Sequence, residues 1–376
     1  MDLAQVLRDG TSRGASDFHL KPRQLPIVRI QGKLAPLEGS APIDAKELFE
    51  LAYSMMSPPQ KERYDRDGGA DVQYSVAGVG RFRASICRAR GTVAVALRVV
   101  PYEIPSFEDL HLPEVISKLS VEPRGLILVT GPAGSGKSTT LAAMINYMNL
   151  NRNDHIVTIE DPIEFLHQDK NCIITQREVG SDCPTFAEAL RICLRQDPDV
   201  IMVGEMRDLE TVRTVLTLAE TGHLVMSTLH TITAAETVNR VIAEFPGHQE
   251  RQIRNQLSQV LRGILSQRLI DRSDQPGILP AVEVLVSTST IQRCIEDPGR
   301  TADIPKAIAE GKDMYGMQTF DQCVLAYYQQ NMITYETALR ASSSPTDFEV
   351  EVQRLAMAQP QPSRPSTGRV GRPPGR

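Results

Sequence analysis

Alternating hydrophobic and polar positions dominate the first hundred residues. Residues 25–34 hold two short alternating runs around a glycine, a pattern that predicts paired strands. Residues 80–100 alternate again, with a second glycine turn between two longer runs. Between these regions, apolar residues at helical spacing follow Asp44, which predicts a helix that begins after this N-cap and reaches Met56. We therefore expect a small α/β domain in residues 1–100.

Beyond residue 100 the pattern changes to short continuous apolar runs separated by helical segments. Proline-containing residues 101–113 interrupt regular structure and are expected to form a linker. Strands that alternate with helices are typical of a parallel sheet, so residues 114–341 are expected to form an α/β domain with a helical C-terminal part. The predicted buried strands are residues 126–129, 156–159, 200–203 and 224–227.

Two further predictions concern the C-terminal third of the chain. The spacing of its apolar residues predicts one long amphipathic helix over residues 249–267, through Ile253, Leu257, Val260, Leu261 and Ile264. Residues 342–376 are expected to form a partly disordered tail. From Gln359 onward this tail consists almost entirely of Pro, Gln, Ser, Gly and Arg, which bury too little apolar surface to offset the entropy of ordering.

Composition excludes several classes of protein. The chain has 376 residues and a net charge of -5, so there is no overall positive charge to attract nucleic acid. It has no run of 18 apolar residues that would cross a bilayer, and its start lacks the features of a signal peptide. The six cysteines are scattered and never form Cys-x-x-Cys, which is typical of the reducing cytoplasm and predicts neither disulfides nor a zinc site.

A candidate phosphate-binding loop joins the first predicted strand of the second domain to a helix. Its sequence, Gly-Pro-Ala-Gly-Ser-Gly-Lys-Ser, matches the pattern G-x-x-x-x-G-K-[ST]. The glycines allow successive backbone N–H groups to converge on a phosphate, and the helix adds its positive end. Lys137 is expected to reach the β- and γ-phosphates of ATP, and the Ser138 hydroxyl to ligate Mg²⁺. The candidate nucleotide-binding residues are Gly131, Pro132, Ala133, Gly134, Ser135, Gly136, Lys137, Ser138 and Thr139.

Two acidic residues follow predicted buried strands. Glu160 closes the strand 156–159, and Glu205 follows the strand 200–203 after one glycine. Parallel sheets gather ligands at the carboxyl ends of their strands, and ATP hydrolysis needs one group that orients water and one that manages Mg²⁺. A single acidic residue at such a place more often caps a helix or lies in solvent. Two such residues downstream of one phosphate-binding loop favour a role in ATP hydrolysis.

These residues lie in motifs that resemble those of the secretion ATPase superfamily, which covers type II secretion and type IV pilus motors. Residues 158–165, Thr-Ile-Glu-Asp-Pro-Ile-Glu-Phe, resemble its aspartate box. Residues 197–208 resemble its atypical Walker B motif, in which Gly204 replaces the usual Asp, and residues 221–231 resemble its histidine box. The resemblance implies an α/β fold with a RecA-like P-loop core, a small PAS-like N-terminal domain and a helical C-terminal extension.

The resemblance also implies roles for individual residues. Glu160 would polarise the attacking water, Glu205 would hold the hydration shell of Mg²⁺, and His230 would contact the γ-phosphate. Arg83 and Arg98 match the arginines that this family inserts into the nucleotide site of the neighbouring subunit. Taken alone, the two arginines would indicate only a solvated strand face. The family further implies a homohexamer at the cytoplasmic face of the inner membrane, which acts on a pilus platform protein and meets the membrane only through partners.

Three segments bear on the branch of the family. Residues 266–277 lack the Cys-x-x-Cys pairs that extension and type II secretion members usually carry there, and residues 316–322 resemble a C-terminal string of retraction ATPases. Residues 290–295, Thr-Ile-Gln-Arg-Cys-Ile, depart from the Ala-Ile-Arg-Asn-Leu-Ile helix of that branch. The prediction is an ATP-driven retraction motor of the PilT type that supports twitching motility. An accessory or extension-type ATPase, a RecA-like nucleic-acid motor and a non-hydrolysing assembly subunit stay open as alternatives.

Overall fold

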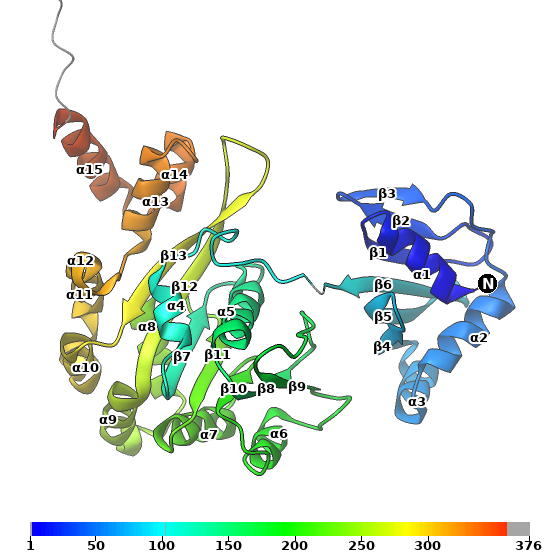
Figure 1. Cartoon of the computed structure of the whole chain (residues 1–376), viewed down its shortest axis with the longest axis horizontal. Coiled ribbons are helices and arrows are strands. Elements are labelled where there is room, and N and C mark those ends of the chain that lie inside the picture. The colour runs from blue at the N-terminus through cyan, green and yellow to red at the C-terminus, as the bar shows by residue number, and fades with distance from the viewer. Residues whose placement is uncertain (1, 102, 359–376) are drawn as a thin grey trace, which may run out of the picture. The chain divides into compact units, whose positions relative to one another are not determined.

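The computed structural model describes residues 2–101 and 103–358, and its first hundred residues form a six-stranded sheet with three helices (Figure 1). The strand order is β3-β2-β1-β6-β5-β4, and every pair of neighbours is antiparallel. The elements are α1 (Leu3–Ser12), β1 (Ala15–Leu20), β2 (Ile27–Ile30), β3 (Lys33–Pro36), α2 (Ala45–Met55), α3 (Pro58–Asp67), β4 (Gly69–Val76), β5 (Gly80–Ala89) and β6 (Thr92–Val100).

The predicted elements of this region are confirmed. The hairpin expected in residues 25–34 is β2 and β3, and the alternating runs of residues 80–100 are β5 and β6. Asp44 caps α2, because its side chain accepts hydrogen bonds from the N–H groups of Lys46 and Glu47. One face of the sheet is buried, and the rings of Phe18 and Phe82 meet edge to face on it at 6.0 Å.

The second sheet has seven strands in the order β13-β12-β7-β11-β10-β8-β9. Strands β9, β8, β10 and β11 pair with one another in parallel, whereas β12 and β13 form an antiparallel hairpin. All four predicted buried strands are confirmed, in β7, β8, β10 and β11. The elements are α4 (Val115–Ser120), β7 (Gly125–Thr130), α5 (Lys137–Asn151), β8 (His155–Glu160), β9 (Ile173–Glu178), α6 (Phe186–Cys193), β10 (Val200–Val203), α7 (Leu209–Glu220), β11 (Leu224–Leu229), α8 (Ala234–Ala243), α9 (Glu250–Val260), β12 (Leu261–Asp271) and β13 (Ile278–Val286).

The prediction of one helix over residues 249–267 is wrong. Helix α9 ends at Val260, and the chain continues directly into β12. The apolar residues after Val260 are buried in the sheet, where β12 pairs with β13 along nine positions from Gly263 to Asp271. A short apolar run that is buried on both faces of a strand has the same composition as a buried helical turn, so its spacing did not distinguish the two.

Helices follow the second sheet, as predicted. They are α10 (Ser289–Glu296), α11 (Ile304–Glu310), α12 (Lys312–Tyr315), α13 (Phe320–Gln329), α14 (Tyr335–Ala341) and α15 (Pro345–Ala358). Phe320, Val324 and Phe348 share a buried cluster with Ile270 and Leu279 of the β12–β13 hairpin. Part of the predicted tail is therefore helical, and residues 359–376 lie outside the described residues.

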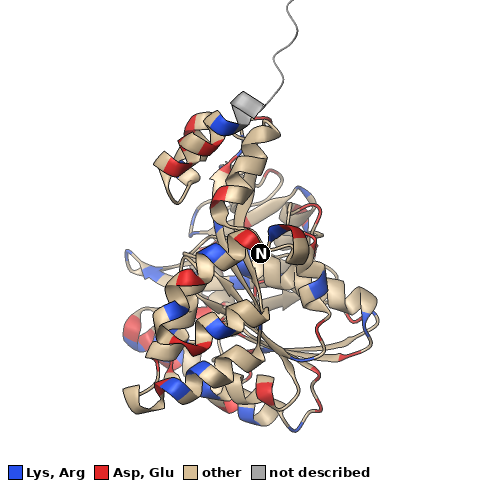
Figure 2. Ribbon diagram, turned by 90° about the vertical axis from the view of Figure 1, so that its left-hand side faces the viewer, with Lys and Arg blue, Asp and Glu red and all other residues tan. Residues whose placement is uncertain are grey.

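Contacts divide the described chain into two compact units. One comprises the residues up to Asp109 together with Ile116–Leu126 and Ser138–Thr228, and the other comprises Leu110–Val115, Ile127–Lys137 and the described residues from Leu229 onward. The boundaries predicted near residues 100, 114 and 341 stay a prediction. Among the described helices, none combines the length and the apolar character that crossing a bilayer requires. Acidic and basic residues are interspersed along the same helices (Figure 2).

Candidate functional site

The candidate phosphate-binding loop connects the end of β7 to the start of α5. Gly131 opens it with a φ of 143°, and Gly134 and Gly136 follow with φ values of 76° and 90°, a region that side chains other than glycine rarely adopt. At Gly131 a Cβ atom would lie 2.2 Å from the carbonyl oxygen of Gln267 and 2.6 Å from the Ser135 hydroxyl. Glycine is therefore required here both by the backbone conformation and by the close approach of β12.

Polar groups of this loop suit an anion. The Lys137 ammonium donates to the carbonyl oxygens of Gly131 and Pro132, at 2.7 and 2.9 Å, so the side chain folds back over its own loop. The Ser135 hydroxyl is buried and has no hydrogen-bond partner within the described part of the chain. A phosphate in the loop would give both groups an oxygen acceptor.

The Glu160 carboxyl lies buried at the end of β8, with 8% of the residue exposed. Oε1 accepts hydrogen bonds from the Thr158 hydroxyl at 2.7 Å and from the Gln176 amide at 3.0 Å, and Oε2 accepts from the N–H of Glu164 at 3.4 Å. Burial raises the pKa of the Glu160 carboxyl, while these hydrogen bonds act in the opposite direction. The result is an oriented carboxyl that is a stronger proton acceptor than a solvated one.

Sequence reasoning missed the residues that orient Glu160. Thr158 precedes it by two positions in one strand, so their side chains share a face, and this relation could have been predicted. Gln176 lies in β9, a strand whose mixed composition gave no signal in the sequence. Its amide also donates to the carbonyl oxygen of Phe165, so it fixes the segment after Glu160 as well as the carboxyl itself.

Close packing explains why residue 204 is a glycine. Its N–H donates to the carbonyl oxygen of Ile159 at 2.8 Å, and a Cβ on Gly204 would lie 3.3 Å from that oxygen and 3.4 Å from Cα of Glu160. The end of β10 therefore lies directly against the end of β8. Glu205 follows, and its Oε2 pairs with Nε of Arg207 at 2.8 Å. The structure thus brings the two predicted acidic segments together.

His230 follows the last residue of β11 and is exposed. The N–H of Gly131 donates to the carbonyl oxygen of Leu229 at 3.3 Å, so the start of the phosphate-binding loop lies beside the residue that precedes His230. The predicted histidine and the predicted loop are therefore adjacent in the fold. His223 lies at the opposite end of β11, and its Nδ1–H donates to the carbonyl oxygen of Leu218 at 3.1 Å, which favours a structural role.

The two predicted arginines occupy paired positions on β5 and β6. Arg83 donates twice to the carbonyl oxygen of Ile163 in its own chain, at 3.1 and 2.7 Å. Arg98 forms an ion pair with Asp17 at 2.8 Å. The structure describes one chain, so a role for either arginine at a neighbouring subunit stays a prediction.

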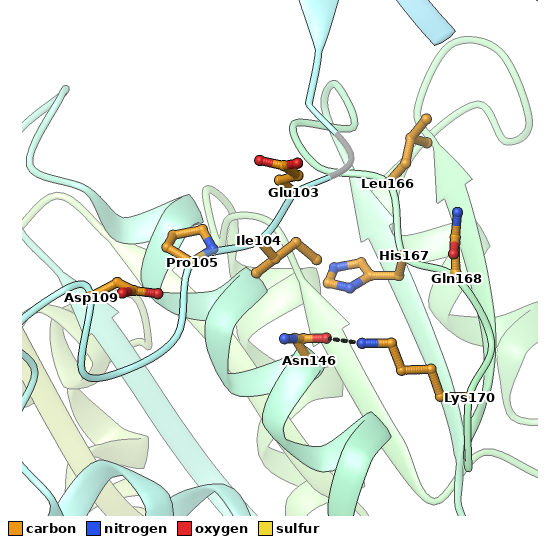
Figure 3. A pocket seen from close by; sticks show the side chains of 9 residues that line it. All are labelled: Glu103, Ile104, Pro105, Asp109, Asn146, Leu166, His167, Gln168 and Lys170. Carbon is orange, nitrogen blue, oxygen red and sulfur yellow. Dashed lines mark hydrogen bonds between the residues drawn. The ribbon is translucent and has the colours of Figure 1, made fainter. Parts of the chain in front are cut away.

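A pocket of about 740 Å³ is lined by residues of the segment 103–109, of α5 and of the segment 166–170 (Figure 3). Lys170 and Asn146 meet in it through a hydrogen bond of 3.0 Å, and burial lowers the pKa of His167 to about 4, which keeps its imidazole neutral near pH 7. None of its lining residues belongs to the predicted nucleotide site. They are Glu103, Ile104, Pro105, Asp109, Asn146, Leu166, His167, Gln168 and Lys170.

Comparison with known proteins decides the family. The sequence model of the family described as type II/IV secretion system protein matches residues 3–301. This chain belongs to that family. Members with similar sequences include the type IV pilus retraction ATPase PilT of Pseudomonas aeruginosa, 41% identical over 93% of this chain and 100% of the relative, and the type IV pilus ATPase PilU of the same organism, 37% identical over 94% of this chain and 92% of the relative.

A solved member of the family has the same fold. The crystal structure of the pilus retraction motor PilT with bound ADP matches with a TM-score of 0.84 and 44% identity, and covers 93% of this chain and 99% of the other. The predicted resemblance to the secretion ATPases and the predicted α/β fold with its helical C-terminal part are both confirmed.

Proposed function

We propose that this chain is the ATP-hydrolysing subunit of a motor that retracts type IV pili and so drives twitching motility. The observation that carries the proposal is the Glu160 carboxyl, buried and oriented by Thr158 and Gln176 in a chain with a complete phosphate-binding loop. Its near full-length similarity to a pilus retraction ATPase supports the retraction role.

In the proposed mechanism the loop of residues 131–138 grips the triphosphate. The Lys137 ammonium leaves the two carbonyl oxygens that it contacts and moves to the β- and γ-phosphate oxygens. Glu160 then accepts a hydrogen bond from the attacking water and aligns it with the γ-phosphate. Its raised pKa suits a group that takes up a proton as the water attacks. His230 directly follows Leu229, which is bonded to the start of the loop. The His230 side chain contacts the γ-phosphate, so its position depends on whether that phosphate is bound.

Magnesium is the ion that this chemistry implies, and the donors fit it. The Ser138 hydroxyl and the Glu205 carboxylate are hard oxygen ligands, and Mg²⁺ is usually bound by one or two protein oxygens together with phosphates and water. Within the described residues no cluster of three or more His, Cys, Asp or Glu side chains could hold a metal. When bound, the ion would neutralise charge on the phosphate oxygens.

We propose a homohexamer at the cytoplasmic face of the inner membrane. In this ring the subunits act on a pilus platform protein, and they contact the membrane only through such partners. ATP and Mg²⁺ are the proposed cofactors, and nucleic acid is not a proposed partner. The net charge of -5 supports this choice, because nucleic acid attracts a basic surface.

Arg83 and Arg98 are proposed to act on the nucleotide of the neighbouring subunit. An arginine supplied in trans is worth about 10³-fold or more in rate. We expect Arg83→Ala to leave ATP affinity nearly unchanged and to lower turnover strongly. Turnover is then measured in rings that mix Arg83→Ala with Lys137→Ala, and we expect activity to be partly recovered, because a Lys137→Ala subunit supplies Arg83 to the intact nucleotide site of its neighbour. No recovery in the mixed rings contradicts a trans role and favours a role for the bond to Ile163 within one chain.

Deletion in the native host tests the function. Surplus surface pili without twitching motility are the expected result for a retraction motor. Cells without surface pili would contradict this role and indicate an ATPase that drives pilus extension. An accessory ATPase is the second candidate, supported by the similarity to PilU and by the altered segment 290–295. For that role we expect normal pili and weakened motility.

A further inference from the structure

The β12–β13 hairpin packs directly against the start of the phosphate-binding loop. The Thr130 hydroxyl, on the last residue of β7, donates to the Ser266 hydroxyl at 3.0 Å, and both residues are fully buried. The next residue of β12, Gln267, presents the carbonyl oxygen that excludes a side chain at Gly131. The hairpin therefore contacts the two residues at which the strand becomes the loop.

The same hairpin carries a buried carboxyl. Glu283 of β13 pairs with Ser266 of β12, and 6% of it is exposed. Its Oε1 accepts a hydrogen bond from the N–H of Ala234 at 2.8 Å, at the start of α8. Burial raises the pKa of Glu283, whereas the Ala234 amide and the nearby Arg268 act in the opposite direction. A carboxyl is costly to bury unless its oxygens are bonded, so this contact holds it in place.

Hydrogen bonds within the chain segment and α8 fix the residues that connect His230 to α8. They include bonds that join Thr231 to Thr237 at 2.7 Å, Ile232 to Glu236 at 3.0 Å and Thr233 to Glu236 at 3.2 Å. The bond from Ala234 to Glu283 differs from these, because its acceptor belongs to β13. A movement of β13 therefore acts through this bond on the residues that directly follow His230.

Strand β13 is also bound to the C-terminal helices. Val284 exchanges two backbone hydrogen bonds with Gln318, at 2.8 and 3.2 Å, and the Gln318 amide donates to the carbonyl oxygen of Val282 at 2.8 Å. The Arg268 guanidinium of β12 lies 3.8 Å from the centre of the Phe320 ring, at the first residue of α13. Glu283 thus lies between two residues that are tied to the segment before α13.

We propose that Glu283 is a positioning residue that couples His230 to the C-terminal helices. Its Oε1 accepts a hydrogen bond from the N–H of Ala234 at the start of α8, and so fixes the backbone that follows the histidine. A displacement of β13 by the C-terminal helices changes the position of His230 at the phosphate. The inference rests on the proposed role of His230 in hydrolysis.

The test uses the full-length assembled protein and measures kcat, KM and ADP affinity. Glu283→Met keeps the side-chain volume and removes the acceptor, and we expect kcat to fall about tenfold while ADP affinity changes less than about twofold. Glu283→Gln keeps an acceptor oxygen and is expected to recover most of the turnover. Ala234→Pro removes the same bond from the donor side, at the first helical position, where proline is tolerated, and is expected to reproduce the loss. Glu310→Ala, which removes an exposed carboxylate paired with Lys306, is the control and is expected to match the wild type.

A double-mutant cycle with His230→Ala separates the possible outcomes. If Glu283 acts through His230, Glu283→Met causes no further loss of kcat in the His230→Ala background. If the losses of kcat in Glu283→Met and His230→Ala multiply in the double variant, the coupling is overturned and the proposed function is unaffected. An unchanged kcat in folded Glu283→Met or Ala234→Pro would have the same consequence. Wild-type turnover in His230→Ala itself would overturn both the role of the histidine and the inference that depends on it.

Discussion

Glu160→Gln is expected to lower kcat by about 10³-fold, a loss typical of a removed general base. The amide keeps the shape of the carboxyl and can still bond to Thr158, so the fold and the phosphate-binding loop are retained. It cannot accept a proton, and its NH₂ group faces the water that the carboxylate would orient. Turnover is measured as phosphate release from the assembled protein, and ATP affinity with a fluorescent analogue, which is expected to bind as tightly as to the wild type.

Glu164→Gln is the matched control for this prediction. Glu164 lies in the same segment and is exposed, and it contacts Glu160 through its backbone N–H rather than through its side chain. Its neutralisation is expected to leave kcat near the wild-type value. If Glu160→Gln retains substantial turnover, another group activates the water and the proposed mechanism is wrong.

Gly131→Ala is expected to weaken nucleotide binding by about 100-fold, or about 3 kcal/mol. Two costs combine: the φ of 143° is strained for alanine, and its Cβ would collide with the carbonyl oxygen of Gln267 at 2.2 Å. Relief requires β7 and β12 to separate at Thr130, or the loop to change its conformation. ADP affinity by calorimetry and the midpoint of thermal unfolding measure the two effects.

Gly134→Ala distinguishes the collision from the backbone strain. Gly134 has a φ of 76°, and a Cβ there would meet nothing within 4 Å. Its substitution is expected to cost about 1 kcal/mol of strain only, and so a much smaller loss of affinity. Equal losses in the two variants would show that the contact with Gln267 is unimportant.

The sequence predicted the parts of the fold that depend on local pattern. The runs that form β7, β8, β10 and β11 are almost entirely apolar, so their assignment as buried strands and their order along the chain could be inferred. The run that follows Val260 could not be assigned in this way, because polar residues such as Arg262, Ser266 and Gln267 interrupt it and its apolar residues continue the helical spacing of α9. Its partner β13 lies across a turn whose pairing depends on tertiary contacts.

The candidate site shows the same division. The phosphate-binding loop, Glu160 and Glu205 were predicted because short motifs carry them. Gln176 and Glu283 were not, since each acts across a gap in sequence: 16 residues separate Gln176 from Glu160, and 49 separate Glu283 from Ala234. No periodicity in the chain encodes such contacts, and only the packing of strands brings them together.

The close contact at Gly204 bears on how this ATPase could be redesigned. Most P-loop enzymes carry an aspartate at the end of the corresponding strand, so Gly204→Asp is the obvious substitution for raising the affinity for the metal ion. Here any side chain at position 204 would press on the peptide that bears Glu160 and force it to shift by a few tenths of an ångström. A conventional metal ligand would thus be gained at the expense of the alignment of the carboxyl that we propose activates water. Engineering of this motor should therefore keep glycine at position 204 and change the affinity for the metal ion through Glu205.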